Sequence, residues 1–131
     1  METDRALLLI EQRGSTLAKA VLKRELIPFN FDSLLRVKST VTRASVARGL
    51  LLLPLPLKLR REHSLYRTFN TGDVLLAHQM NCIAIVIERQ LLESLEAFKA
   101  GEVIEGLDNL LPGHLSGMTV TLRMAPAERG I

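Results

Sequence analysis

Two short apolar runs within residues 71–88, joined by one polar turn, constrain this fold most strongly. Gly72-Asp73 opens the stretch as a turn signal, because Gly tolerates positive φ and Asp hydrogen-bonds its own backbone. Residues 74–77 form the first run, and residues 82–87, rich in β-branched side chains, form the second. Runs this short suit strands, and their lack of polar alternation predicts strands that are covered on both faces. We therefore expect a central, buried hairpin.

The size and composition of the chain favour one aliphatic domain. It has 131 residues, so we expect a single domain over residues 1–131, with a frayed tail at 125–131. Apolar residues make up 47% of the sequence but aromatic residues only 4%, so aliphatic side chains must fill the core. No apolar run approaches the roughly 20 residues that a membrane-spanning helix needs. The acidic N-terminus and the single cysteine predict a cytoplasmic protein without a signal peptide or an internal disulfide.

The charge balance does not favour a nucleic-acid-binding protein. Seventeen basic residues are nearly matched by 14 acidic residues, for a net charge of +3, and they read as scattered along the chain. The densest basic cluster is at residues 58–61, and the few aromatic side chains are distant from it. A nucleic-acid surface needs several such clusters beside aromatic side chains, so a solvated basic loop is the preferred interpretation.

Residues 50–59 show the clearest period of two and predict a strand. The leucines face one way and the polar or proline positions face the other; they are Leu53, Leu55, Leu57 and Leu59 against Pro54, Pro56 and Lys58. The two prolines remove ladder donors along one lateral edge, so that edge must be open or loosely paired. Other strands are predicted at residues 6–10, 41–46, 102–105 and 118–124.

Residues 16–24 fit two structures. Lys19 and Lys23 alternate with apolar neighbours as in a strand, whereas Leu17 and Val21 also suit a helix. We favour the strand, because a tight turn after a strand most simply gives a hairpin. The helix remains the alternative.

Helices are predicted in three places. Asn30 or Asp32 caps a short helix over an open end of a β-barrel, and its apolar side consists of Phe31, Leu34 and Leu35. A second amphipathic helix ends at residues 100–101, and its apolar side consists of Leu91, Leu92, Leu95 and Phe98. Residues 106–111 predict a single helical turn.

Three local patterns carry a family resemblance. They are Gly72-Asp73-Val74, the apolar run at residues 82–87, and Val103-Ile104-Glu105-Gly106-Leu107 before the last strand. With the order of elements up to Met124, these patterns resemble a family of uncharacterised microbial proteins with a cyclophilin-like barrel. The resemblance implies a mostly β fold, namely a small closed cyclophilin-like β-barrel of about eight strands with one or two capping helices.

The resemblance does not bring an activity with it, because a shared fold does not transfer function. The peptidyl-prolyl isomerases of this fold use an arginine, a Phe/Met-rich pocket, a glutamine, a tryptophan and a histidine. This chain has no Trp and no matching Phe-His-Arg or Gln-Gly-Gly-Asp run. Family members carry an aromatic residue after the first hairpin strand, where this chain has Ala77-His78-Gln79, and a Trp-Gly where it has Arg48-Gly49. We therefore lean towards a protein that is not an enzyme.

Motifs for cofactors and metals are absent from the sequence. There is no hydrolase elbow, P-loop or dinucleotide fingerprint, so no cofactor is expected. His63, His78 and His114 are far apart and lack a carboxylate or thiol at ligand spacing, so no metal site is expected. Cys82 lies in an apolar strand and is interpreted as a small buried hydrophobe.

The candidate ligand site is the polar turn of the central hairpin. His78, Gln79 and Asn81 supply a titrating ring and two amides at the mouth of the barrel, and Arg43 and Arg48 flank a second turn that could lie beside it. Arginines there would suit a carboxylate or a phosphate, although an ordinary polar turn and solubilising arginines are the simpler reading.

Three functions follow as hypotheses. The first is a non-catalytic module that binds an unknown peptide or small anionic ligand at the barrel mouth. The second is a residual prolyl isomerase, by fold analogy alone. The third is a structural protein that forms a homo-oligomer through its proline-bearing edge.

Overall fold

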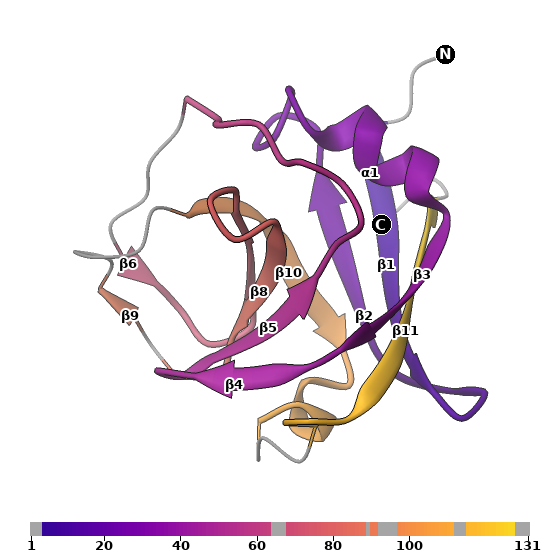
Figure 1. Cartoon of the computed structure of the whole chain (residues 1–131). Coiled ribbons are helices and arrows are strands. Elements are labelled where there is room, and N and C mark those ends of the chain that lie inside the picture. The colour runs from indigo at the N-terminus through magenta and orange to yellow at the C-terminus, as the bar shows by residue number, and fades with distance from the viewer. Residues whose placement is uncertain (1–3, 64–67, 89, 92–96, 112–114, 128–131) are drawn as a thin grey trace.

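The computed structural model describes residues 4–63, 68–88, 90–91, 97–111 and 115–127. Nine strands form one antiparallel sheet that curls into a nearly closed barrel (Figure 1), in the order β3-β11-β1-β2-β10-β7-β8-β5-β4. Their bounds are β1 Arg5–Gln12, β2 Ser15–Lys23, β3 Ser39–Arg43, β4 Ser45–Ala47, β5 Leu50–Pro54, β7 Asp73–Ala77, β8 Cys82–Val86, β10 Phe98–Glu105 and β11 Thr119–Pro126. A separate small sheet pairs β6 (Thr68–Phe69) with β9 (Gln90–Leu91). The helices are α1 (Phe31–Val37) and the 3-10 helix η1 (Leu107–Asn109).

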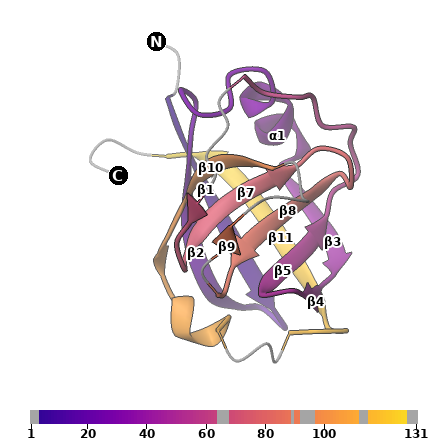
Figure 2. The same cartoon turned by 90° about the vertical axis from the view of Figure 1, so that its left-hand side faces the viewer.

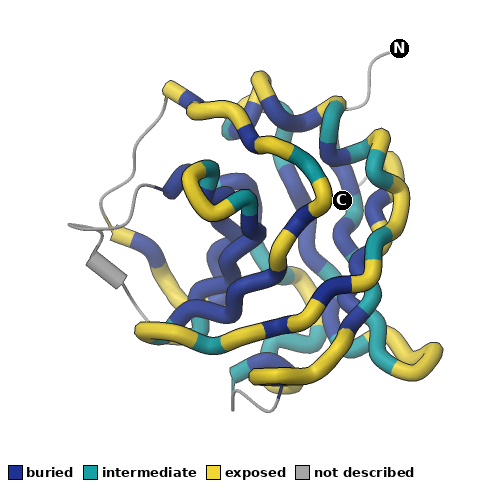
Figure 3. Tube along the Cα trace, viewed as in Figure 1, coloured by how far each residue is buried: buried dark blue, intermediate teal, exposed yellow. Residues whose placement is uncertain are grey.

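The predicted central hairpin is confirmed. β7 and β8 pair antiparallel from Val74↔Ile85 to Ala77↔Cys82, and every residue of both strands is buried. Both faces are covered as predicted, because one face lines the barrel core and the other packs under Phe69 of β6. Figure 3 shows the hairpin as a continuous buried stretch with an exposed tip.

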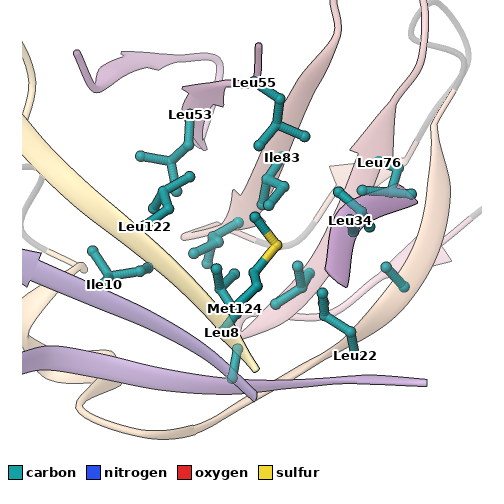
Figure 4. Packing of buried hydrophobic residues seen from close by; sticks show 14 of the residues in the cluster. Leu8, Ile10, Leu22, Leu34, Leu53, Leu55, Leu76, Ile83, Leu122 and Met124 are labelled. Carbon is teal, nitrogen blue, oxygen red and sulfur yellow. The ribbon is translucent and has the colours of Figure 1, made fainter. Parts of the chain in front are cut away.

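Aliphatic side chains fill the barrel. Figure 4 shows residues of β1, β5, β8 and β11 pointing towards one another, including Ile10, Leu53, Ile83 and Leu122, all at 0% exposure. A small barrel has room only for such side chains, so its interior is a packed core rather than a channel. Helix α1 closes one end with Phe31 and Leu34, and η1 lies at the opposite end (Figure 2).

One stretch of chain carries both edges of the barrel sheet. β3 and β4 stand at opposite ends of the strand order, yet only Ala44 separates them in sequence. β3 pairs with β11, and β4 pairs with β5. The predicted strand at residues 41–46 is therefore split into two strands that hold different neighbours. The barrel is joined through this stretch by covalent bonds, while its hydrogen-bond ladder stays interrupted.

The strand predicted for residues 50–59 is too long. β5 ends at Pro54, and residues 55–63 continue as an irregular segment with a bend at residues 56–57, which we call the strap. The predicted alternation is confirmed for Leu53, Leu55 and Leu59, which are buried, and for Pro54, Pro56 and Lys58, which are exposed, whereas Leu57 is half-buried. The β5–β8 ladder stops at Pro54 because its partner strand β8 begins at Cys82, and the next bond, from Leu55 N to Asn81 O, already reaches the turn.

The second predicted helix is wrong in its described part. Phe98 begins β10, and Ala100 and Gly101 lie inside this strand instead of ending a helix. An apolar spacing of three to four residues misled the prediction, although Phe98, Lys99 and Ala100 also alternate in burial as in a strand. Leu91 lies in β9, while Leu92 and Leu95 lie outside the described residues.

Most of the remaining predicted helices and strands are confirmed. Residues 16–24 form a strand, β2, as preferred, and the helical turn near residue 107 and the final strand are confirmed. The first helix is confirmed, but Asn30 makes no side-chain cap to it. Residues 125–126 belong to β11 rather than to a frayed tail, and residues 128–131 lie outside the described part.

Candidate functional site: an open edge in the barrel wall

The polar turn predicted as a ligand site joins β7 to β8 beside α1 and the strap. Gln79 and Met80 are exposed at its tip, while the ring of His78 packs against Phe98 with centroids 5.4 Å apart. Asn81 has a φ of +51°, which few side chains other than Gly, Asn and Asp accept. These features shape the turn, and ligand binding by His78 or Gln79 remains a prediction.

Asn81 has a structural role that its sequence position did not suggest. Its backbone oxygen accepts a hydrogen bond from the N–H of Leu55 at 2.8 Å, and its side-chain Oδ1 accepts one from the N–H of Leu59 at 2.8 Å. The side chain therefore fastens the strap to the hairpin. Its acceptor oxygen is already engaged, so Asn81 is a support of the strap.

The two arginines predicted beside this turn lie at the other end of the barrel wall. Arg48 is in the β4–β5 turn, next to Leu50, which pairs with Val86 at the far end of β8. Arg43 ends β3 and pairs with Thr119. The structure does not bring Arg48 together with His78, Gln79 and Asn81, because the length of β8 lies between Arg48 and the turn. Ligand binding by Arg43 or Arg48 remains a prediction.

The open edge of the barrel is the backbone of β3 on the side away from β11. Lys38 O accepts a bond from Met124 N at 2.6 Å, and Ala44 N donates to Met118 O at 2.8 Å. Backbone groups alternate in direction along a strand, so the even-numbered residues 38–44 face β11 and the odd-numbered residues face the other way. Ser45 and Ala47 continue this odd row, and they find β5 as their partner.

Ser39, Val41 and Arg43 belong to the same odd row, but among the described residues no strand is hydrogen-bonded to this side of them. Within the described residues, no backbone bond joins residues 39–43 to β5 or to the strap. We call the outward backbone groups of Ser39, Val41 and Arg43 the β3 edge. All three residues are exposed, and 67% of the surface of Val41 is accessible to solvent. An unpaired row of this kind is a template for another strand.

Two prolines explain why the β3 edge stays open. Leu55 N bonds to Asn81 O on the β8 side, so by alternation Pro54 faces the β3 side, and Pro56 follows in a bend just beyond β5. Proline has no N–H, so neither residue can continue the ladder that β4 and β5 begin. The sequence prediction that these prolines mark an open or loosely paired edge is confirmed.

All the charged residues in the segment that carries this edge are basic. Residues 33–61 contain no acidic residue and seven basic ones, all exposed: Arg36, Lys38, Arg43, Arg48, Lys58, Arg60 and Arg61. This segment forms the end of α1, then β3, β4, β5 and the start of the strap. The rest of the chain carries a net charge of −4. The interpretation of the basic residues as scattered is therefore wrong, and the long gap between Asp32 and Glu62 was the signal for it.

A pocket of about 500 Å³ lies beside the start of β3. Leu35 of α1, Lys38, Ser39 and residues 123–126 of β11 line it. Arg123 at its rim pairs with Glu11 at 3.0 Å. The pocket therefore adds an apolar lining and the cation of Lys38 next to the N-terminal end of the β3 edge.

A buried carboxylate holds the far end of the strap, and sequence reasoning missed it. Glu62 is 3% exposed and accepts hydrogen bonds from Phe29 N at 3.2 Å and from Asn30 Nδ2 at 2.6 Å. Asn30 also bonds both backbone groups of Arg60 at 2.8 Å. Burial raises the pKa of Glu62 above its usual value. The pair fastens the strap to the start of α1.

The other reactive side chains form no catalytic or metal-binding group in the described residues. No cluster of three His, Cys, Asp or Glu residues is found there. Cys82 is buried, its Sγ donates to Met80 O at 3.3 Å, and burial raises the pKa of the thiol. His63 stacks near Phe29 with ring centroids 5.1 Å apart. His114 lies outside the described residues.

Comparisons with known proteins support the fold alone. No family model matches the chain, and no curated protein matches it. One similar solved structure is the solution structure of the hypothetical protein AF2241 from Archaeoglobus fulgidus. It superposes with a TM-score of 0.69 at 12% sequence identity, over 96% of this chain and 98% of that one. The two proteins therefore share the whole barrel fold, but a sequence identity this low carries no information about function.

No helix among the described residues is long and apolar enough to cross a membrane.

Proposed function

We propose that this protein is a non-catalytic module that binds an extended peptide segment, which adds as a strand to the β3 edge. The observation that carries this proposal is the row of unpaired backbone groups at Ser39, Val41 and Arg43. Each residue offers one N–H donor and one C=O acceptor, so the edge can form the ladder that strand addition uses. The proposed peptide site is therefore in the barrel wall, at β3, and not at the barrel mouth as the sequence suggested.

Two features of β3 support this use of the edge. The run Thr40-Val41-Thr42 is β-branched throughout, which favours an extended backbone. Edge strands that must avoid pairing usually carry a proline, a bulge or an inward charge, and β3 has none of these along residues 39–42. Its cations stand only at the two ends, at Lys38 and Arg43.

We also propose a family and a cellular location for this protein. The three local patterns and the barrel support a cyclophilin-like family, and the single cysteine supports a cytoplasmic location. Binding is proposed without catalysis, because the groups that the edge presents are main-chain amides.

The test uses the neutral strand probe acetyl-Thr-Val-Thr-Val-Thr-amide, titrated into labelled protein and followed by NMR. The backbone amides of Val41 and Arg43 should shift on addition, while those of Thr40 and Thr42, which already face β11, should shift less. Val41→Pro removes the central donor of the edge and should weaken binding at least about fivefold. Val41→Thr keeps the donor and the β-branched shape, so it is the matched control.

A second probe guards against a folding defect in Val41→Pro. The same peptide with N-methyl groups on alternate residues lacks donors along one of its edges, so one of the two methylation patterns should abolish binding to the unchanged protein. No shift at β3 with the unmodified probe up to about 5 mM would overturn the proposal, because millimolar affinity would be visible there. Equal binding by both methylated probes would overturn it as well.

A further inference from the structure

We infer that the peptide taken by the β3 edge is acidic, with carboxylates on both sides of a short apolar or β-branched run. This inference rests on the proposed function and names the chemistry of its partner. It follows from the segregation of charge in residues 33–61, which hold seven exposed cations and no acid.

The cations border the open edge on both sides. On the β3 side, Lys38 and Arg43 flank the strand, five residues apart in number and on either side of exposed Val41. On the strap side, Lys58 and Arg60 are exposed beyond Pro56. An added strand in register with β3 would place its terminal residues near Lys38 and Arg43, where carboxylates lower the energy of both charges.

The two acids that flank this segment in sequence, Asp32 and Glu62, are engaged by other residues. Asp32 is paired with Arg24 at 2.9 Å, and the hydrogen bond from Arg24 lowers the pKa of Asp32. Glu62 is buried and bonded to Asn30. Glu102 and Glu105 of β10 form ion pairs with lysines of β2, which lies three strands from β3 in the sheet order.

A second copy of the chain fits this edge less well than an acidic peptide. Antiparallel pairing of two β3 strands about Val41 would set Ser39 of one against Arg43 of the other, and Lys38 next to Arg43. Each copy would bring the same cations to the contact, and like charges placed opposite one another destabilise strand pairs. The charge pattern therefore disfavours homodimerisation through this edge.

A nucleic acid would also be attracted by seven cations, but it cannot use the backbone ladder. Single strands are held mainly by stacking of bases on aromatic side chains. The segment from residue 33 to residue 61 contains no Phe, Tyr or Trp. The edge and the charge together therefore favour a peptide.

The experiment compares three probes with one backbone: acetyl-Glu-Val-Thr-Val-Glu-amide, its neutral Thr-terminated form and its Lys-terminated form. The acidic probe should bind about three- to tenfold more tightly than the neutral one, and the basic probe more weakly than both. Raising the salt concentration from about 0.05 M to about 0.5 M should remove most of this difference. Lys38→Gln with Arg43→Gln should remove the preference while the neutral probe still binds. Lys19→Gln, on β2 three strands away, is the control and should leave the preference unchanged.

The outcomes separate the two proposals. Equal binding of the three probes at β3 overturns the acidic preference and leaves strand addition standing. Failure of all three to bind overturns strand addition itself. Tighter binding of oligo-dT than of the acidic probe, with shifts at the same amides, overturns the inference in favour of a nucleic acid. A dimer whose interface amides are those of Val41 and Arg43 overturns it in favour of self-association.

Discussion

The side-chain nitrogen of Asn30 lies 2.6 Å from Oε2 of Glu62, and both residues are almost completely buried, at 1% and 3% exposure. This bond joins the start of α1 to the strap, which borders the β3 edge. A carboxylate buried in this way has a raised pKa, because burial penalises its charged form. The pair therefore makes the attachment of the strap sensitive to pH.

The sign of this pH dependence follows from the raised pKa. A carboxyl group that holds its proton more tightly in the folded state stabilises the fold at low pH, and it loses this contribution as pH rises through the folded pKa. Glu62→Gln removes the titration but leaves one of the two donors, Phe29 N or Asn30 Nδ2, without an acceptor. The stability of the wild type relative to Glu62→Gln should therefore be greatest near about pH 4 and should fall towards about pH 8.

Thermal melts of the two proteins across this pH range give the measurement. Subtracting the melting temperature of the variant cancels the titration of groups that both proteins share. A constant difference would show that Glu62 does not titrate with a raised pKa, and a difference that grows with pH would reverse the sign.

Asn81 should be sensitive to substitution for two separable reasons. Asn81→Ala removes the acceptor of Leu59 N and forces an alanine to a φ of +51°, so we expect a loss of about 2–4 kcal/mol in unfolding free energy. Asn81→Gly removes only the acceptor and should lose about 1–2 kcal/mol. Urea unfolding of both variants measures the two losses. A loss for Asn81→Ala that is no greater than the loss for Asn81→Gly would contradict the backbone part of this account.

Gly101 should tolerate no side chain. A Cβ at this position would lie 1.7 Å from the backbone oxygen of Val21, so β10 could not stay paired with β2. Gly101→Ala should cost at least about 3 kcal/mol or prevent folding. Gly14→Ala is the control, because nothing lies within 4 Å of its Cβ and only its φ of +80° is unfavourable. Near-equal melting temperatures for the two variants would show that β2 and β10 are not this close.

Much of the barrel could be predicted because its signals are local. Residues 82–87 lack polar alternation, and a run this short and rich in β-branched residues favours a strand covered on both faces. Pro54 and Pro56 indicate an open edge whatever strand lies next to them, because proline always lacks the backbone N–H donor. These predictions needed no knowledge of the partner strands.

The errors arose where a non-local contact decides the structure. Phe98 extends an apolar spacing of three to four residues that suits a helix. The pairing of β10 with β2 and β7, which lie far away in sequence, shows that this backbone is a strand. Arg43 and His78 could not be placed relative to each other, since strand register is set by pairing across the sheet. The sequence shows that residues 33–61 contain basic residues and no acidic ones. Only the structure shows that this segment carries the open edge of the sheet.

Hydrogen exchange of the backbone amides of β3 in the free protein tests the central claim most directly. Thr40 and Thr42 face β11, so their amides should exchange slowly, whereas those of Val41 and Arg43 should exchange nearly as fast as in an unstructured chain. Adding acetyl-Glu-Val-Thr-Val-Glu-amide should then slow Val41 and Arg43 selectively. Strong protection of Val41 and Arg43 without any peptide would contradict the account, because the edge would already be occupied within the fold.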